Sequence, residues 1–433
     1  PKEAITYLAN VLDVEIKNSN IKKVLDLSGY FVKSCYICGN YFGVTESVDA
    51  IISQLENTMG VAGADIALIK TRKLRALLNI GNSEQIINMV NEEIIPDLES
   101  TLNVGVKDTT YKNLLINGLI LSRIYLAKAY ALQGNHTVNN VVQDLKVFYE
   151  LYHINTDYYI VQTEIIDAFA NTIVGELNKS NDILNKLADA YKSRVMEKNL
   201  LAEWNLVNII NRVLAGQDEN LKIDLFELAA FANNINEYFI KNIVKLILGY
   251  VIEQEGDSVK ALEIYNEGIT YFAKEKVAIG ALFAWALLVN SYLKSDDIEK
   301  ALNTASKSLE ISKSAKINNY LFAIYFKRML SKIYIQQGDL ESSKMYLEES
   351  ITTAKQFGLK YSLVGLYIEY ANYIEAVMKA KHIYSSENVK KAYDLYKRAV
   401  TMAKELDIQY LTEQAQRARA GFKTFCQLNS IEL

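Results

Sequence analysis

Proline is nearly absent from this chain of 433 residues, which contains two Pro and only 19 Gly. No proline follows Pro96. Sheet proteins of this size use many Pro and Gly residues in their turns, whereas long stretches without these residues are typical of helices. We therefore predict an all-α protein.

Cysteine and an excess of charge of one sign are also missing. Three Cys in 433 residues cannot form a disulfide framework, which favours a reducing, cytoplasmic location. The 47 Lys and Arg nearly balance the 51 Asp and Glu, so neither direct nucleic-acid binding nor a polybasic membrane surface is expected. The chain begins at Pro1 instead of Met, which favours a fragment of a larger polypeptide with further domains.

One long uncharged run stands out, from Val277 to Leu293. Its length is at the lower limit for a membrane-spanning helix. It contains Gly280, Asn290 and Ser291, and it falls in phase with a repeat described next. We therefore predict that the run forms a buried helix of a soluble protein.

Pairs of small residues recur in the second half of the chain at intervals of roughly 40 to 49 residues. In each pair the second small residue lies two helical turns after the first and is followed directly by Ile, Leu or Val. Residues at this spacing share one face of a helix, where small side chains let a neighbouring helix approach closely. The pairs are Ala261/Gly268, Ala301/Ser308, Ser343/Ser350 and Ala392/Ala399.

A second amphipathic helix precedes each pair. Large side chains stand nine positions before the first small residue, at Ile252, Tyr292, Tyr334 and Ile383. One turn earlier stand Leu248, Leu288, Leu330 and Lys379, the last of which breaks the pattern. Asp257, Asp297 and Asp339 fall between the two helices, where they can cap the second. Each unit is therefore predicted to be a helical hairpin, and hairpins of this kind must stack to bury their apolar faces.

These residues resemble the tetratricopeptide repeat. Trp285, Leu288, Tyr292, Ala301 and Ser308 match the pattern of that family in one unit, and Tyr334, Gly338 and Asp339 match it in the next. The units lack the closing Pro of the family and are longer than its standard 34 residues, as in the long-repeat forms of MalT-type activators and Rap proteins. The resemblance implies an all-α, α-α superhelix of stacked hairpins.

The repeat divides the chain into two continuous parts. We expect divergent hairpins over 1–200. Turn-like points recur at Gly39, Gly81, Gly134, Gly175 and Gly216. Around Gly39 the spacing of Tyr41 and Ala50 fits the repeat, whereas farther on Ile86, Asn139 and Leu221 replace the small residues. More regular repeats are expected over 201–433, ending in a polar closing helix from Leu411 to Leu428.

Motifs that carry chemistry were not found, because the sequence has no GxxxxGK, GxGxxG, HExxH or GxSxG pattern. Cys35 and Cys38 are spaced like half of a zinc site, but a second ligand pair does not follow, and Cys38 falls at a small packing position. His136, His153 and His382 are scattered in turns or near helix ends. We predict no enzyme activity, no metal and no cofactor.

The resemblance implies that the first helix of each hairpin lines the inner, concave surface. The binding residues expected there are Tyr250, Phe283, Asn290, Tyr325, Arg328, Lys332 and Lys381. This surface would run from apolar to cationic, so it predicts a protein or peptide partner that combines acidic and hydrophobic residues. The leading hypothesis is a non-enzymatic binding scaffold within a larger regulatory protein. The alternative is the small-molecule-sensing domain of a bacterial transcriptional regulator, with an apolar groove around Leu206, Val207 and Ile210.

Overall fold

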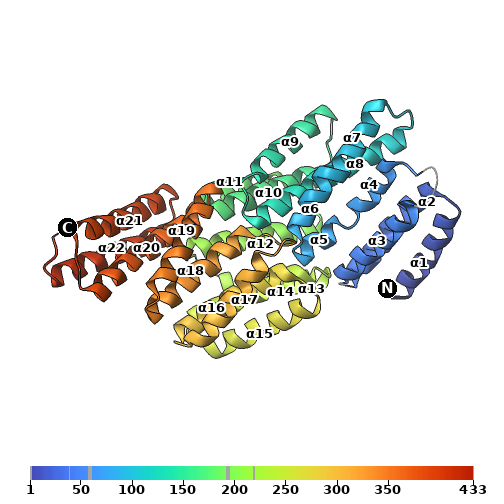
Figure 1. Ribbon diagram of the computed structural model, residues 1–433. Helices are drawn as coiled ribbons and strands as arrows, with labels where there is room; N and C mark the ends of the chain where they lie inside the picture. Colours follow the sequence, from blue (N-terminus) through green and yellow to red (C-terminus); the bar gives the residue numbers. More distant parts are fainter. Residues whose placement is uncertain (1, 39, 57–60, 192–195, 218–219, 433) are drawn as a thin grey trace.

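A computed structural model describes residues 2–38, 40–56, 61–191, 196–217 and 220–432. These residues form α-helices and one π-helical turn, with no strand among them, so the predicted all-α class is confirmed. Figure 1 shows the helices as one elongated array, with the N-terminal helices at the right and the C-terminal helices at the left. The expected turn at Gly39 lies outside the described residues.

The helices of the N-terminal part are α1 (Lys2–Lys17), α2 (Ile21–Ile37), α3 (Tyr41–Glu56), α4 (Gly63–Thr71), α5 (Leu74–Ile80), α6 (Ser83–Met89), the π-helical turn η1 (Val90–Ile94), α7 (Ile95–Val104), α8 (Thr109–Gln133), α9 (Val138–Leu151), α10 (Asp157–Val174) and α11 (Leu177–Tyr191). Those of the C-terminal part are α12 (Lys198–Ala215), α13 (Leu221–Asn234), α14 (Tyr238–Gln254), α15 (Ser258–Lys274), α16 (Ala278–Lys294), α17 (Ile298–Ser312), α18 (Tyr320–Gln337), α19 (Leu340–Gln356), α20 (Lys360–Lys381), α21 (Ser386–Glu405) and α22 (Gln409–Leu428).

The four hairpins predicted from the repeat are present. They are α14/α15, α16/α17, α18/α19 and α20/α21, and the two helices of each pack against each other. All eight small residues of the four pairs are buried, so the predicted helix crossings are confirmed. Closely packed small residues leave no room for a larger side chain at these positions.

Aspartate caps three of the second helices, as predicted. The side chains of Asp257, Asp297 and Asp339 accept hydrogen bonds from backbone N–H groups three residues later, at 3.0, 3.3 and 3.1 Å. Such caps satisfy donors that have no partner within the helix. Ser385 caps α21 in the same way, accepting from the N–H of Asn388 at 3.2 Å.

The register predicted for the first helix of the fourth hairpin is wrong. The helix α20 has 22 residues, compared with 17 in α14 and α16, so its turn comes later. Ile383, expected to pack at the end of this helix, lies beyond it and is 59% exposed. Ile374 and Met378 are the buried residues near its end.

The pattern expected around Gly39 is also wrong. Tyr41 begins α3 instead of ending a first helix, and Ala50 is exposed on the same helix. Cys35 is the buried cysteine there, whereas Cys38 lies at the C-cap of α2 and is only partly buried. Tyr41 is buried together with Val44, Val48 and Ile52 of the same helix, so its distance of nine residues from Ala50 does not mark a hairpin.

Two helices are apolar enough to raise the question of a membrane. The run from Val277 to Leu293 lies in α16 and is largely buried within the superhelix, as predicted. Among the described residues, α8 alone has the length and apolarity of a membrane span, and 61% of its most apolar window is buried inside the protein. Burial of this extent is typical of a core helix.

The superhelix brings early helices against late ones. The inner helices α5, α8, α10 and α12 contact α16, α18, α20 and α22, respectively. Gly81, Gly134, Gly175 and Gly216 each end one helix of the first set. A Cβ atom on these glycines would lie 2.5–3.0 Å from Ile279, Leu321, Tyr361 and Tyr410, at the starts of the second set. We call these four contacts the seam.

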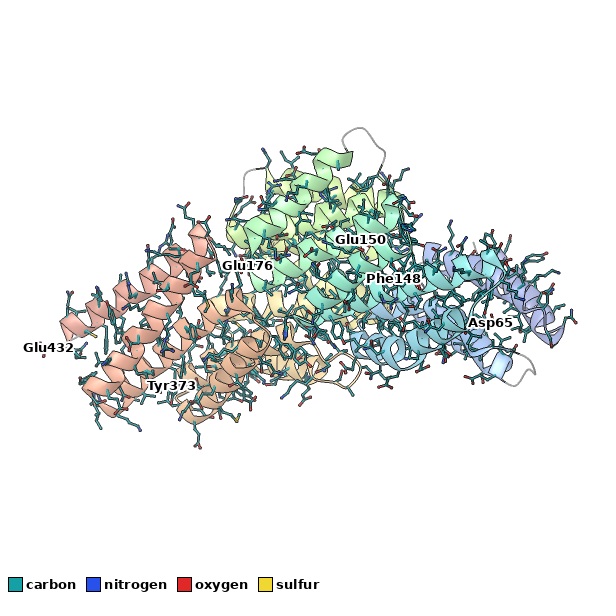
Figure 2. All side chains as sticks on the ribbon, turned by 90° about the horizontal axis from the view of Figure 1, so that it is seen from above. Asp65, Phe148, Glu150, Glu176, Tyr373 and Glu432 are labelled. Carbon is teal, nitrogen blue, oxygen red and sulfur yellow. The ribbon has the colours of Figure 1, made fainter. Side chains whose placement is uncertain are left out.

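Polar side chains reinforce the seam. Lys360 Nζ lies 2.6 Å from Glu176 Oε1, and Figure 2 labels Glu176 near the centre of the array. Asn319 Nδ2 donates to the carbonyl oxygen of Leu132 at 2.6 Å. The largest buried apolar cluster likewise contains residues from both sides of residue 200, from Leu12 in α1 to Leu288 in α16.

Candidate functional site

A cavity of about 550 Å³ lies along the inside of the superhelix. Its walls come from α5, α8, α10, α12, the start of α14, α16, α18 and the first turn of α20. These are the first helices of their hairpins, and the resemblance to the tetratricopeptide repeat implied that such helices line the binding surface. These helices come from both sides of the seam, so the cavity has walls from early and from late helices.

Most of the wall is apolar. Leu206, Val207 and Ile210 line it from α12, and Ile243 and Ile247 line it from α14. The groove that motivated the small-molecule alternative is therefore part of this cavity. A large apolar pocket with few polar groups is the usual form of a ligand site.

Two ion pairs line the cavity on the side of the N-terminal helices. Arg75 Nη2 lies 2.6 Å from Glu237 Oε1, and Lys128 Nζ lies 2.8 and 3.0 Å from the two carboxylate oxygens of Glu203. The first pair joins α5 to the N-cap of α14, and the second joins α8 to α12. Because each of these charges has a partner, the pairs hold the wall together without leaving a free charge there.

Arg328 is a different kind of cation. Its guanidinium lies 5.9 Å from the ring centroid of Tyr325, and both residues line the cavity. Its Nε is buried with no hydrogen-bond partner, and the structure shows no ion pair to it among the described residues. Tyr361 and Ser362, in the first turn of α20, line the cavity as well.

Tyrosines near Arg328 remain neutral at physiological pH. Burial raises the pKa values of Tyr325 and Tyr361 to about 12. The nearby charge of Arg328 acts in the opposite direction but is the smaller effect. The hydroxyl of Tyr325 donates to the carbonyl oxygen of Ala286 at 2.9 Å, which fixes its ring. These rings therefore provide rigid, uncharged walls beside the cation.

The structure brings three of the seven expected binding residues together. Phe283, Tyr325 and Arg328 line the cavity, whereas Tyr250, Asn290, Lys332 and Lys381 do not. Along α14, α16 and α18 the lining ends at Ile247, Leu287 and Arg328, respectively. Tyr250, Asn290 and Lys332 lie farther along these helices.

Lys332 and Lys381 illustrate why a side chain on an inner helix need not reach the cavity. Lys332 Nζ forms an ion pair with Glu369 Oε1 at 2.8 Å, one turn beyond Arg328. Lys381 is exposed in the last turn of α20. Counted from the start of each inner helix, the position of Tyr250, Asn290 and Lys332 is occupied in α20 by Asn372, not Lys381.

Sequence reasoning missed the contribution of the N-terminal helices. Arg75, Lys128, Glu203 and Glu237 show no repeat pattern, and the partners in each pair lie far apart in the chain. The recurring glycines were the available signal, because Gly81, Gly134, Gly175 and Gly216 mark where these helices meet the later ones.

The cysteines and histidines take ordinary structural positions. The three cysteines, Cys35, Cys38 and Cys426, are free thiols. Burial, and to a smaller extent the neighbouring Cys38, raises the pKa of the Cys35 thiol to about 11. No three His, Cys, Asp or Glu side chains of the described residues are grouped so that they could hold a metal ion. His136 packs beside Phe357 across the seam, with ring centroids 6.2 Å apart.

Comparison with solved structures identifies the fold. A Rap protein crystallised in complex with Competence and Sporulation Factor aligns with a TM-score of 0.52 at 11% identity. The alignment covers 83% of this chain and 98% of the Rap chain. The chain has a tetratricopeptide-like repeat fold.

Other comparisons add little to this tetratricopeptide-like assignment. A STAND protein with a tetratricopeptide repeat sensor from Pyrococcus horikoshii aligns with a TM-score of 0.41 at 14% identity, over 85% of this chain and 57% of that protein. No family model matches the sequence, and no curated protein matches it either.

Proposed function

We propose that this protein is a binding scaffold that encloses a short peptide in its inner cavity. The observation that carries the proposal is the cavity itself, about 550 Å³ in volume and walled by inner helices from both sides of the seam. This volume lies within the range of sites that bury most of a small ligand. Apolar side chains of the peptide would replace water along α12 and α14.

Binding fits the lining better than catalysis does. The lining residues include no His and no Cys, and four of the five charged residues among them are already joined in ion pairs. Acid–base or nucleophilic catalysis needs an activated group beside an oriented partner.

The free thiols of all three cysteines support a reducing, cytoplasmic location for this scaffold.

The likeness to the Rap protein supports the proposal of a binding scaffold by analogy. It shares the fold over most of both chains, and it was solved with Competence and Sporulation Factor bound. We propose that this chain forms part of a larger regulatory protein whose state responds to the bound peptide.

The proposal can be tested with a variant whose larger side chain fills part of the cavity. Ile210 lines it, so Ile210→Trp would occupy part of its volume, whereas Ile223 on α13 is 58% exposed on the outside. A library of synthetic hexapeptides, each with apolar residues and one Asp, is incubated with the protein, and retained peptides are identified by mass spectrometry. Peptides that bind the wild type and Ile223→Trp but not Ile210→Trp would support the proposal. Failure of the wild type to retain any peptide would refute it.

A small-molecule sensor is the second candidate, because Leu206, Val207 and Ile210 form a largely apolar wall of the cavity. An apolar small molecule would fill this space without needing the extended backbone contacts of a peptide. Stabilisation of the protein by a small-molecule library, without retention of any peptide, would favour this candidate.

A further inference from the structure

We propose that Arg328 binds a carboxylate group of the ligand, so that the peptide presents its C-terminus or an acidic side chain at the α18–α20 end of the cavity. This inference rests on the proposed function and specifies the chemistry of the same site. Its first support is the difference between Arg328 and the cations beside it on α18. Lys327 pairs with Glu349 and Lys332 pairs with Glu369, each at 2.8 Å, while Arg328 faces the cavity without an acidic partner among the described residues.

A partly buried charge without a partner needs compensation. Taking a guanidinium out of water is costly, and proteins normally offset this cost with an ion pair or hydrogen bonds. No described residue supplies an acceptor for the buried Nε of Arg328. An anionic group of a ligand would supply both the missing charge and the missing acceptor.

The surroundings of Arg328 hold its side chain in one place. Tyr325 packs against it on α18, and Gly365 on α20 leaves room for it on the other side. A Cβ atom at Gly365 would lie 2.2 Å from Nη1 of Arg328. The hydroxyls of Ser362 and Tyr361 lie on the neighbouring turn of the same helix and can donate to a second ligand oxygen.

The charge balance of the cavity favours a monoanion. Among its lining residues, Arg75, Lys128 and Arg328 are cations, and Glu203 and Glu237 are anions, which leaves one positive charge. A carboxylate neutralises that charge. A phosphate group carries close to two negative charges at neutral pH, so it would leave one of them uncompensated in an apolar cavity.

The experiment compares ligands that differ only in this charge. Hexapeptides retained by the wild type are synthesised with Asp or Asn and with a free or amidated C-terminus, and their affinities are measured by calorimetry. Hexanoate and hexanamide serve as small probes, followed through the NMR signal of the Arg328 Nε–H. The proteins are the full chain, Arg328→Gln, Arg328→Lys and the control Lys344→Gln, which removes a charge from the exposed face of α19. Thermal melts establish that each variant is folded.

We expect one carboxylate to contribute about tenfold or more in affinity to the wild type and to Lys344→Gln. That preference should vanish in Arg328→Gln and return in part in Arg328→Lys. If Arg328→Gln bound the carboxylate peptides as tightly as the wild type, the inference would be overturned and the peptide-binding proposal would stand. If hexanoate shifted the Arg328 signal and no peptide bound, the carboxylate site would stand and the peptide proposal would fall. If inorganic phosphate displaced the peptide and hexanoate did not, the assignment of a carboxylate would be wrong.

Discussion

Gly134 and Leu321 lie in contact across the superhelix, so that a Cβ atom on Gly134 would stand 2.5 Å from Cγ of Leu321. Gly134 ends α8 with a φ of +76°, and Leu321 lies in the first turn of α18. The glycine therefore serves two purposes, because it permits the left-handed helix end and it leaves space for the later helix. The same arrangement recurs at each step of the seam.

The contact predicts that Gly134→Ala is more harmful than an ordinary substitution at a helix end. Gly338 is the matched control, because its φ of +81° is similar and nothing lies within 4 Å of the added Cβ. Gly338→Ala should cost about 1–2 kcal/mol of unfolding free energy from backbone strain alone. Gly134→Ala should cost roughly 1–3 kcal/mol more because it overpacks the seam. Denaturant unfolding of both variants measures the difference.

A double substitution shows whether the extra cost comes from Leu321. In a Leu321→Ala background, the penalty of Gly134→Ala should fall to that of Gly338→Ala, which a double-mutant cycle reports as a coupling energy. Equal penalties for Gly134→Ala and Gly338→Ala in the wild-type background would show that the seam contact does not contribute to stability.

The buried small residues of the hairpins make a second prediction. Ala301 and Ala392 are fully buried between helices. Replacing either with Leu should force the helices apart and cost roughly 1–3 kcal/mol. Lys307 lies exposed on the same helix as Ala301, and Lys307→Leu should be nearly neutral. Circular-dichroism melts that found all three variants equally stable would contradict the packing described for these hairpins.

Cys35 and Cys38 yield a prediction about metal content. Cys35 is 2% exposed in the apolar core, and its raised pKa favours the neutral thiol instead of the thiolate that zinc requires. The double substitution of both cysteines by Ala should therefore leave the protein folded. Elemental analysis of the wild type should find no stoichiometric zinc. About one zinc per chain, lost in the double variant, would be the opposite result.

Alkaline pH should weaken the part of the fold around the cavity. Burial raises the pKa values of Tyr325 and Tyr361 from their ordinary value of 10.0 to about 12. A raised value in the folded state means that the stabilisation is complete below about pH 10 and is lost as the pH rises towards 12. We expect the melting temperature to fall over this interval, together with the ultraviolet signal of tyrosinate.

Tyr325→Phe separates the effect of one phenol from the rest. It removes the hydrogen bond to Ala286 and should cost about 1 kcal/mol at neutral pH. The variant should also lose less stability than the wild type between pH 10 and 12. An unchanged slope of stability against pH in Tyr325→Phe would show that this hydroxyl does not contribute to the alkaline transition.

The hairpins could be predicted from the sequence because their determinants are local. The pairing of Ala301 with Ser308 depends on the helical period, and Asp297 caps the N–H of a residue three positions away. Both patterns can be found within a single unit of about 40 residues. The fold class, the small-residue packing and the aspartate caps were therefore determined by the sequence alone.

The cavity was decided by the tertiary structure. Arg75 meets Glu237 across 162 residues of chain, and Asn319 meets Leu132 across 187, because the superhelix returns to the same place after several hairpins. No local pattern encodes that return, since it is the sum of the small rotations between successive hairpins. The repeat spacing predicted Lys381 at the position that corresponds to Lys332 in the next unit. Because α20 is longer than the other inner helices, Asn372 occupies that position instead. Helical periodicity thus determined which faces pack together, and the pitch of the superhelix decided which residues share the cavity.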